Sequence, residues 1–172
     1  MARIFAAIML PIEVQVHLDE YLDGVRTARS DLRWSPPAKW HCTLQYLGEC
    51  GPHEVDRQLG RWELRAKRGR PMQLNLAGAG TFPHAAIART LWAGLDGELD
   101  AWRRVAGPDQ QAHVTLARTR ERIDLTGLVD DLEGYVGPTW TAEELAVVES
   151  HLQGSGERGR RYEPLEFFPL GG

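Results

Sequence analysis

Hydrophobic and polar positions along this chain change from one repeating pattern to another and predict a mixed α+β fold. Residues 3–10 form a short apolar stretch that ends before a proline, which is typical of a strand. Residues 12–28 then place apolar side chains among charged ones at helical spacing. Both patterns recur later in the chain. We expect further helices over about 53–67, 98–105 and 124–135, and further strands over 40–47, 72–78, 89–95, 112–117, 143–152 and 160–168.

The order of these elements indicates an internal duplication. A strand, a helix, a strand, a helix and further strands occur in the first half, and much the same order follows in the second. We therefore predict one domain over 1–172, made of two interleaved and pseudo-duplicated lobes. The predicted fold class is α+β and bilobal, with antiparallel sheets around a central cleft and helices on the outside. The glycine-rich stretch 153–160 is predicted to be the flexible loop of a closing hairpin.

One four-residue pattern, His-x-Thr-Leu, occurs twice. The first copy begins at His41 and the second at His113, which is 113 − 41 = 72 residues later. Both copies lie in predicted strands, where side chains alternate between two faces. His41 and Thr43 therefore share one face of their strand, as do His113 and Thr115. Each copy presents one imidazole beside one hydroxyl.

Composition limits the classes of function that this chain can have. Its 172 residues are 42% hydrophobic and 26% charged, which is ordinary for one globular domain. The formal net charge, 20 − 24 = −4, argues against a protein that coats long nucleic acid through its overall field. A small anion held by a few side chains is still compatible with this charge.

The length of the first apolar run and the number of cysteines indicate where in the cell the protein is found and whether it binds a metal. The first apolar run is too short to span a bilayer, and no small-residue cleavage site follows it. Cys42 and Cys50 provide no disulfide framework, and the spacing of His and Cys matches no common zinc pattern. We expect a cytoplasmic protein that uses no metal and no other cofactor.

Two imidazoles in one cleft suit general acid–base chemistry, because one ring can accept a proton while the other donates one. The neighbouring Thr43 and Thr115 hydroxyls can donate to an anionic oxygen. Arg118, five residues after His113, adds a guanidinium fork that suits phosphate. A phosphodiester fits this set of groups. The alternative is that each His and Thr is an ordinary strand residue, and the repetition of the motif favours the site.

Several aromatic residues and the other histidines are interpreted mainly as core, surface or loop residues rather than as site residues. Phe5 and Trp34 can stack on a nucleobase, although packing in the core is the competing interpretation for both. We expect core positions for Trp62, Trp92 and Trp102, and surface or loop positions for His17, His53, His84 and His151.

The quoted residues also resemble a known family. The chain is similar to the 2H phosphoesterases, and within them to the RNA 2′,3′-cyclic phosphodiesterases of bacteria and archaea, also called 2′-5′ RNA ligases. The similarity extends beyond the two motifs and covers nearly the whole chain. It rests on the stretches RIFAAIMLP, LRWSPPAKWHCTLQYLGE, GAGTFP, LWAGL, HVTLAR and the closing ES…YEPLEFFPL, which follow the order of the family.

This resemblance implies a reaction and a role for each site residue. The implied fold is bilobal, with both motifs in a central groove. The implied reaction is metal-independent hydrolysis of 2′,3′-cyclic phosphate RNA ends or nucleotides to 2′-phosphates, with reversible 2′-5′ RNA ligation as a second activity. His41 resembles the proton donor and His113 the proton acceptor, while Thr43, Thr115 and Arg118 resemble the phosphate-binding residues. The expected partners are RNA ends or cyclic nucleotides with a 2′,3′-cyclic phosphate, with no membrane or protein partner, and we expect a monomer.

Two departures from the family pattern concern substrate preference. Trp40 is bulky where a smaller apolar residue commonly precedes the first motif, and the approach to the second motif, residues 105–112, is short. Two alternative functions are also kept. One is a non-catalytic module that binds phosphorylated RNA ends, and the other is a phosphodiesterase for a cyclic phosphate that is not RNA.

Overall fold

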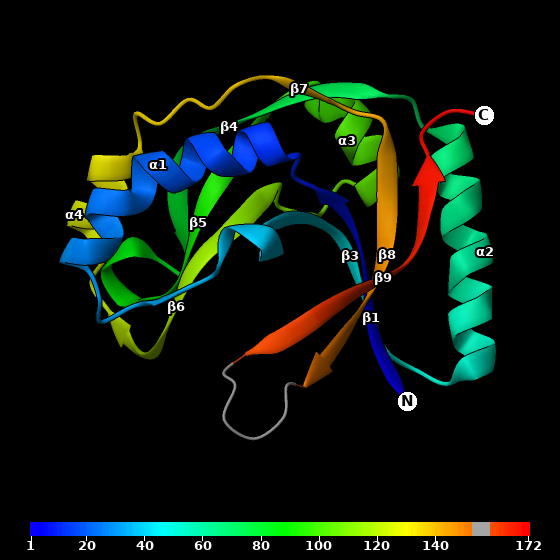
Figure 1. Ribbon diagram of the computed structural model, residues 1–172, viewed down its shortest axis with the longest axis horizontal. Coiled ribbons are helices and arrows are strands. Elements are labelled where there is room, and N and C mark those ends of the chain that lie inside the picture. Colours follow the sequence, from blue (N-terminus) through cyan, green and yellow to red (C-terminus); the bar gives the residue numbers. More distant parts are fainter. Residues whose placement is uncertain (153–158) are drawn as a thin grey trace.

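The computed structural model describes residues 1–152 and 159–172 and has the predicted α+β fold (Figure 1). Its described residues form one curled antiparallel sheet and four helices. The helices are α1 (Ile12–Ala28), α2 (Pro52–Arg68), α3 (Leu99–Ala106) and α4 (Thr126–Leu132), with short 3-10 helices at Pro37–Lys39 and Ala85–Ile87. The strands are β1 (Ala2–Met9), β2 (Arg33–Trp34), β3 (His41–Cys50), β4 (Met72–Phe82), β5 (Ala88–Gly97), β6 (His113–Ile123), β7 (Trp140–Ala142), β8 (Glu144–Leu152) and β9 (Arg160–Pro169).

The sheet brings the two motif strands together at its centre. Its strand order is β7-β4-β5-β6-β3-β1-β8-β9, and β2 pairs with β6 beside this path. β8, from the end of the chain, lies next to β1 from its beginning, and β9 follows β8 at the edge, so that each half of the sheet combines distant segments (Figure 1). The strands β3 and β6 each start with the histidine of one motif. The division into two duplicated lobes stays a prediction.

The helices cover one face of the sheet. α2 packs on β1, β3, β8 and β9, and α4 packs on β4, while α1 lies beside α4 in Figure 1. Trp62 of α2 and Trp102 of α3 are buried in this core, as the sequence predicts. Along β1, Ile4 and Ile8 face the helices, whereas Phe5 joins a smaller apolar cluster on the other face. The alternation of β1 therefore supplies both faces of the sheet with apolar side chains.

Several boundaries differ from those that the hydrophobic pattern predicts. β6 continues to Ile123 through five consecutive polar residues, 118–122, and it pairs with β5 at both ends of this segment, at Arg118 and at Ile123. The short strands β2 and β7 were not expected, and α4 is shorter than the predicted helix 124–135. The predicted hairpin of β8 and β9 is present, and residues 153–158 of its loop lie outside the described residues. No described helix is long and apolar enough to cross a bilayer.

Candidate active site

The motif side chains share one face of the sheet. Cys42 of β3 and Val114 of β6 are directly opposite each other, and both are fully buried on the side of the helices. The histidine and threonine of each motif flank this pair, so they lie on the opposite face. Because the strands pair at these two residues, the His41 and Thr43 side chains lie next to those of His113 and Thr115 on that face. The structure thus brings together four predicted site residues that are far apart in the sequence.

Both histidine rings are held in the same way by the backbone. His41 Nδ1 is 2.8 Å from the carbonyl oxygen of Lys39, and His113 Nδ1 is 2.7 Å from that of Gln111. A carbonyl oxygen can only accept a hydrogen bond, so each Nδ1 carries a proton and donates it. In the neutral rings the free electron pair is therefore on Nε2. His41 Nε2 lies 3.1 Å from the hydroxyl oxygen of Thr43.

Two aromatic rings flank His41. The ring of Phe5 stacks on it, with centroids 4.7 Å apart and an interplanar angle of 28°. Tyr162 of β9 meets the His41 ring edge-on at a centroid distance of 5.4 Å. Tyr162 is a contact that the sequence pattern did not predict, because β9 reaches this place only through its pairing with β8. Phe5 is 6% exposed, so most of its surface packs inside the protein.

His113 has aromatic neighbours of its own. Phe82 of β4 meets its ring edge-on at 5.0 Å, and the centroid of Trp92 lies 5.9 Å away. The prediction that Trp92 fills the core is incomplete, because this residue is only partly buried and lies on the face of the site. Gly80 makes this position possible, since a Cβ there would lie 2.3 Å from the indole ring of Trp92.

Burial and positive charge favour the neutral form of both histidines. Burial is the largest influence and lowers the pKa of His41 and of His113 below the ordinary value of 6.5, while the hydrogen bonds to backbone carbonyls act in the opposite direction. The charge of Arg118 further lowers the pKa of both rings, and the charge of His113 lowers the pKa of His41. Arg118 is therefore electrostatically coupled to both motifs.

A second arginine, Arg33, lies beside Arg118. The two residues are direct partners in the pairing of β2 with β6, and both side chains are exposed. Like charges opposite each other on neighbouring strands repel, which makes this place suitable for an anion. No sequence pattern indicates Arg33 as a site residue, because only the pairing of the two-residue strand β2 shows its position. Thr90 of β5 is the partner of Arg118 on the other side.

Trp34 follows Arg33 and is directed to the opposite face. It pairs with the buried Ala117, packs against the core, and donates its indole N–H to the Arg29 carbonyl oxygen at 2.9 Å. Base stacking by Trp34 and by Phe5 stays a prediction, and both rings have protein partners.

The remaining histidines lie outside the two motif strands. His53 and His84 are exposed, and His17 contacts the hydroxyl of Tyr135 at 2.9 Å. His151 lies on β8 beside Glu149 and Glu163, at 3.5 and 2.9 Å. These three residues offer ligand atoms within 4.8 Å of one another, and in the described part of the chain they form the group that could hold a metal ion.

The chain is similar to known phosphoesterases in sequence and in fold. The model of a family described as LigT like Phosphoesterase matches residues 8–92. An RNA 2′,3′-cyclic phosphodiesterase from Methanothermobacter thermautotrophicus is 23% identical over 98% of both chains. A crystal structure from Thermus thermophilus is 27% identical, with a TM-score of 0.79 over 98% of this chain and 97% of that one. The crystal structure of E. coli LigT complexed with 3′-AMP is 20% identical, with a TM-score of 0.69 over 99% of both chains.

Proposed function

Because the model of the LigT-like phosphoesterase family matches residues 8–92, we propose that this chain hydrolyses 2′,3′-cyclic phosphates at RNA ends, or in nucleotides, to 2′-phosphates. The observation that carries the proposal is the shared face of β3 and β6, on which the histidines of both motifs lie. The name of the relative from Methanothermobacter thermautotrophicus supports a cyclic phosphodiester as substrate.

The two histidines divide the proton transfers of this reaction. His113 Nε2 accepts a proton from the attacking water as the new O–P bond forms. The bond from phosphorus to the 3′-oxygen breaks, and His41 Nε2 donates a proton to that oxygen. The product has a 2′-phosphate and a 3′-hydroxyl. The fixed Nδ1 protons support this proposal, since they leave Nε2 of each ring for the exchange. The choice of donor and acceptor follows the family resemblance.

Hydrogen-bond donors around the rings suit the phosphate. The hydroxyls of Thr43 and Thr115 and the guanidinium of Arg118 would bind the non-bridging oxygens, where negative charge increases in the transition state. The coupling of Arg118 to both rings supports its position near the phosphorus. If a 5′-hydroxyl replaces water as the attacking group, the same groups form a 2′-5′ linkage.

Hydrolysis of a 2′,3′-cyclic nucleotide in the presence of EDTA tests this proposal. We expect a 2′-monophosphate as the product, identified by ³¹P NMR. His41→Ala or His113→Ala should lower the rate at least about a hundredfold, because each positioned proton transfer contributes about that much. His53→Ala, an exposed histidine on α2, is the control and should keep the rate of the original protein.

Each other outcome of this experiment has a definite meaning. A requirement for added metal would reject the mechanism, and unchanged rates in either motif variant would reject the assigned roles. Tight binding of the cyclic phosphate without turnover would instead favour the non-catalytic binding module. Turnover of a cyclic phosphate that is not RNA, with none for RNA ends, would favour the other alternative substrate.

A further inference from the structure

A pocket that neither motif forms lies where β1 ends. It has a volume of about 340 Å³, which is within the range of about 300–1,000 Å³ that is usual for ligand pockets. β1 and β8 pair as far as Ala7 and Ala146, after which Ile8 and Met9 continue beside β3 alone. The pocket therefore opens in the gap where β8 leaves β1.

This pocket adjoins the first motif. Met9, which lines it, is the direct partner of His41 in the pairing of β1 with β3. Directly opposite residues of an antiparallel pair have their side chains next to each other on one face. Ala146 also lines the pocket and belongs to the same apolar cluster as Phe5, whose ring stacks on His41. A ligand in the pocket would thus be a neighbour of a phosphate bound at His41.

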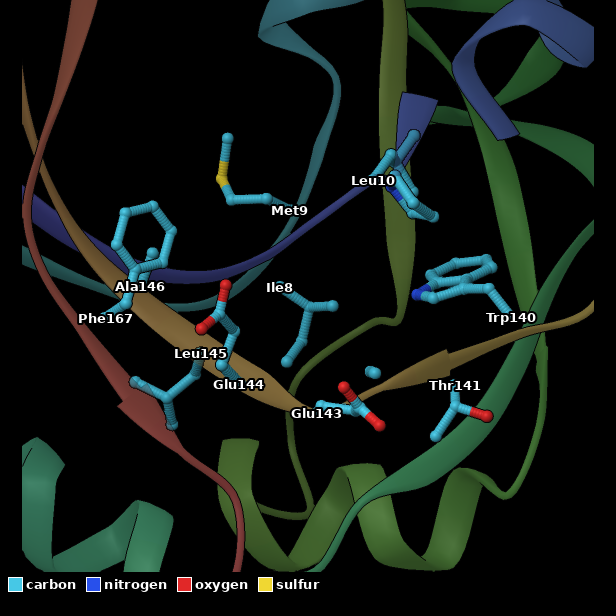
Figure 2. Close-up of a pocket in the computed structure, with 12 residues that line it drawn as sticks. Ile8, Met9, Leu10, Trp140, Thr141, Glu143, Glu144, Leu145, Ala146 and Phe167 are labelled. Carbon is cyan, nitrogen blue, oxygen red and sulfur yellow. The ribbon is translucent and has the colours of Figure 1, made fainter. Parts of the chain in front are cut away.

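The chemistry of the lining does not suit a phosphate. Figure 2 shows Trp140 and Phe167 on opposite sides of the pocket, with the carboxylates of Glu143 and Glu144 between them in this view. None of the described residues that line the pocket is Lys, Arg or His. Two carboxylates repel an anion, whereas aromatic rings and carboxylate acceptors suit a planar, uncharged group that has N–H donors.

We propose that this pocket binds the nucleobase of the substrate nucleotide and that it favours guanine. This inference rests on the proposed function, because it assumes that the phosphate of the same nucleotide lies at His41. Guanine presents two neighbouring donors, N1–H and the N2 amino group, which match the two oxygens of one carboxylate. Uracil presents a single N–H between two carbonyl oxygens. These oxygens are acceptors, so the carboxylate oxygens would repel them.

Steady-state kinetics with the four 2′,3′-cyclic mononucleotides test the proposal. We expect the guanine nucleotide to have the highest kcat/KM and the uracil nucleotide the lowest, with a difference of about tenfold, as a hydrogen bond to a charged group would give. Glu143→Gln or Glu144→Gln should remove this preference through a higher KM for the guanine nucleotide. Trp140→Ala should raise KM for all four. Glu166→Gln, an exposed carboxylate beside Phe167 in the sequence, is the matched control and should keep the preference.

A failure of the inference can be distinguished from a failure of the proposed function. Equal kcat/KM values for the four nucleotides, or an unchanged preference in both glutamate variants, would overturn the guanine pocket while hydrolysis itself stands. If no nucleotide is hydrolysed, the proposed function fails, and isothermal titration with guanosine 2′-monophosphate and uridine 2′-monophosphate decides the inference. Tighter binding of the guanosine compound that is lost in a glutamate variant would support the pocket, and equal binding would overturn it.

Discussion

The rings of Phe5 and His41 stack with their centroids 4.7 Å apart, so Phe5 shields one face of His41 from water. Because burial is the main reason for the lowered pKa of His41, Phe5→Leu should raise this pKa toward 6.5. The swap of one apolar side chain for another should cost about 1 kcal/mol of stability. An NMR titration of the histidine ring protons measures the change. A pKa of His41 that stays constant or falls would contradict this interpretation of the stack.

The same lowered pKa values predict the pH dependence of catalysis. A proton acceptor must be neutral and a proton donor must be charged, which gives a bell-shaped profile of kcat/KM between the two pKa values of the free enzyme. Both histidines have a pKa below 6.5, so the maximum should lie below pH 6.5. A profile of kcat/KM from pH 4 to pH 9 in buffers of constant ionic strength checks this expectation. A maximum above pH 7 would contradict the lowered pKa values of the two histidines in the free enzyme.

The free energy of unfolding should also depend on pH, because the pKa values of both histidines are lowered in the folded protein. A histidine with a lowered pKa in the folded protein binds more protons when the chain is unfolded. The free energy of unfolding should therefore rise with pH from the folded-state pKa values up to about 6.5 and then level off as far as these two groups are concerned. Urea unfolding of the original protein and of His41→Gln at several pH values measures the slope. The slope should be smaller in the variant.

The two arginines of β2 and β6 should contribute unequally to substrate binding. Arg118→Gln should lower kcat/KM about a hundredfold, because it removes a charged donor at the developing negative charge. Arg33→Gln should raise KM by at most about fivefold, since Arg33, unlike Arg118, is not among the charges that lower the pKa of the two histidines, and an exposed charge away from the rings contributes at most about 1 kcal/mol. The effect of Arg33→Gln should disappear at high salt, which screens exposed charges. Kinetics at two salt concentrations test both expectations, and equal effects of the two variants would contradict the assigned positions.

The sequence was sufficient for the elements that local patterns determine. The alternation around His41 and His113 correctly placed each histidine and threonine on one face of a strand, and the helical spacing after Pro11 predicted α1. Apolar periodicity depends on neighbouring residues, so it is visible without a structure. The prediction that both motifs share a site needed the repeat and the family resemblance as well.

Contacts between distant strands could not be predicted in this way. Tyr162 and Phe82 reach the histidines only through the register of β9 with β8 and of β4 with β5. Arg33 faces Arg118 through a strand of two residues, which is too short to have a periodic pattern. The pairing register depends on the whole sheet, and a shift by one residue would direct every side chain to the other face.

The close packing of Trp92 on Gly80 predicts a substitution that lowers the rate of catalysis. In Gly80→Ala the new Cβ would lie 2.3 Å from the indole ring, so Trp92 must move away and change its contact with His113. We expect kcat to fall about tenfold, as positioned proton transfers are sensitive to geometry. Gly60→Ala on α2 is the matched control, because nothing lies within 4 Å of its Cβ, and it should keep kcat and increase stability by about 0.5–1 kcal/mol. An unchanged kcat in Gly80→Ala would show that the position of Trp92 does not matter to His113.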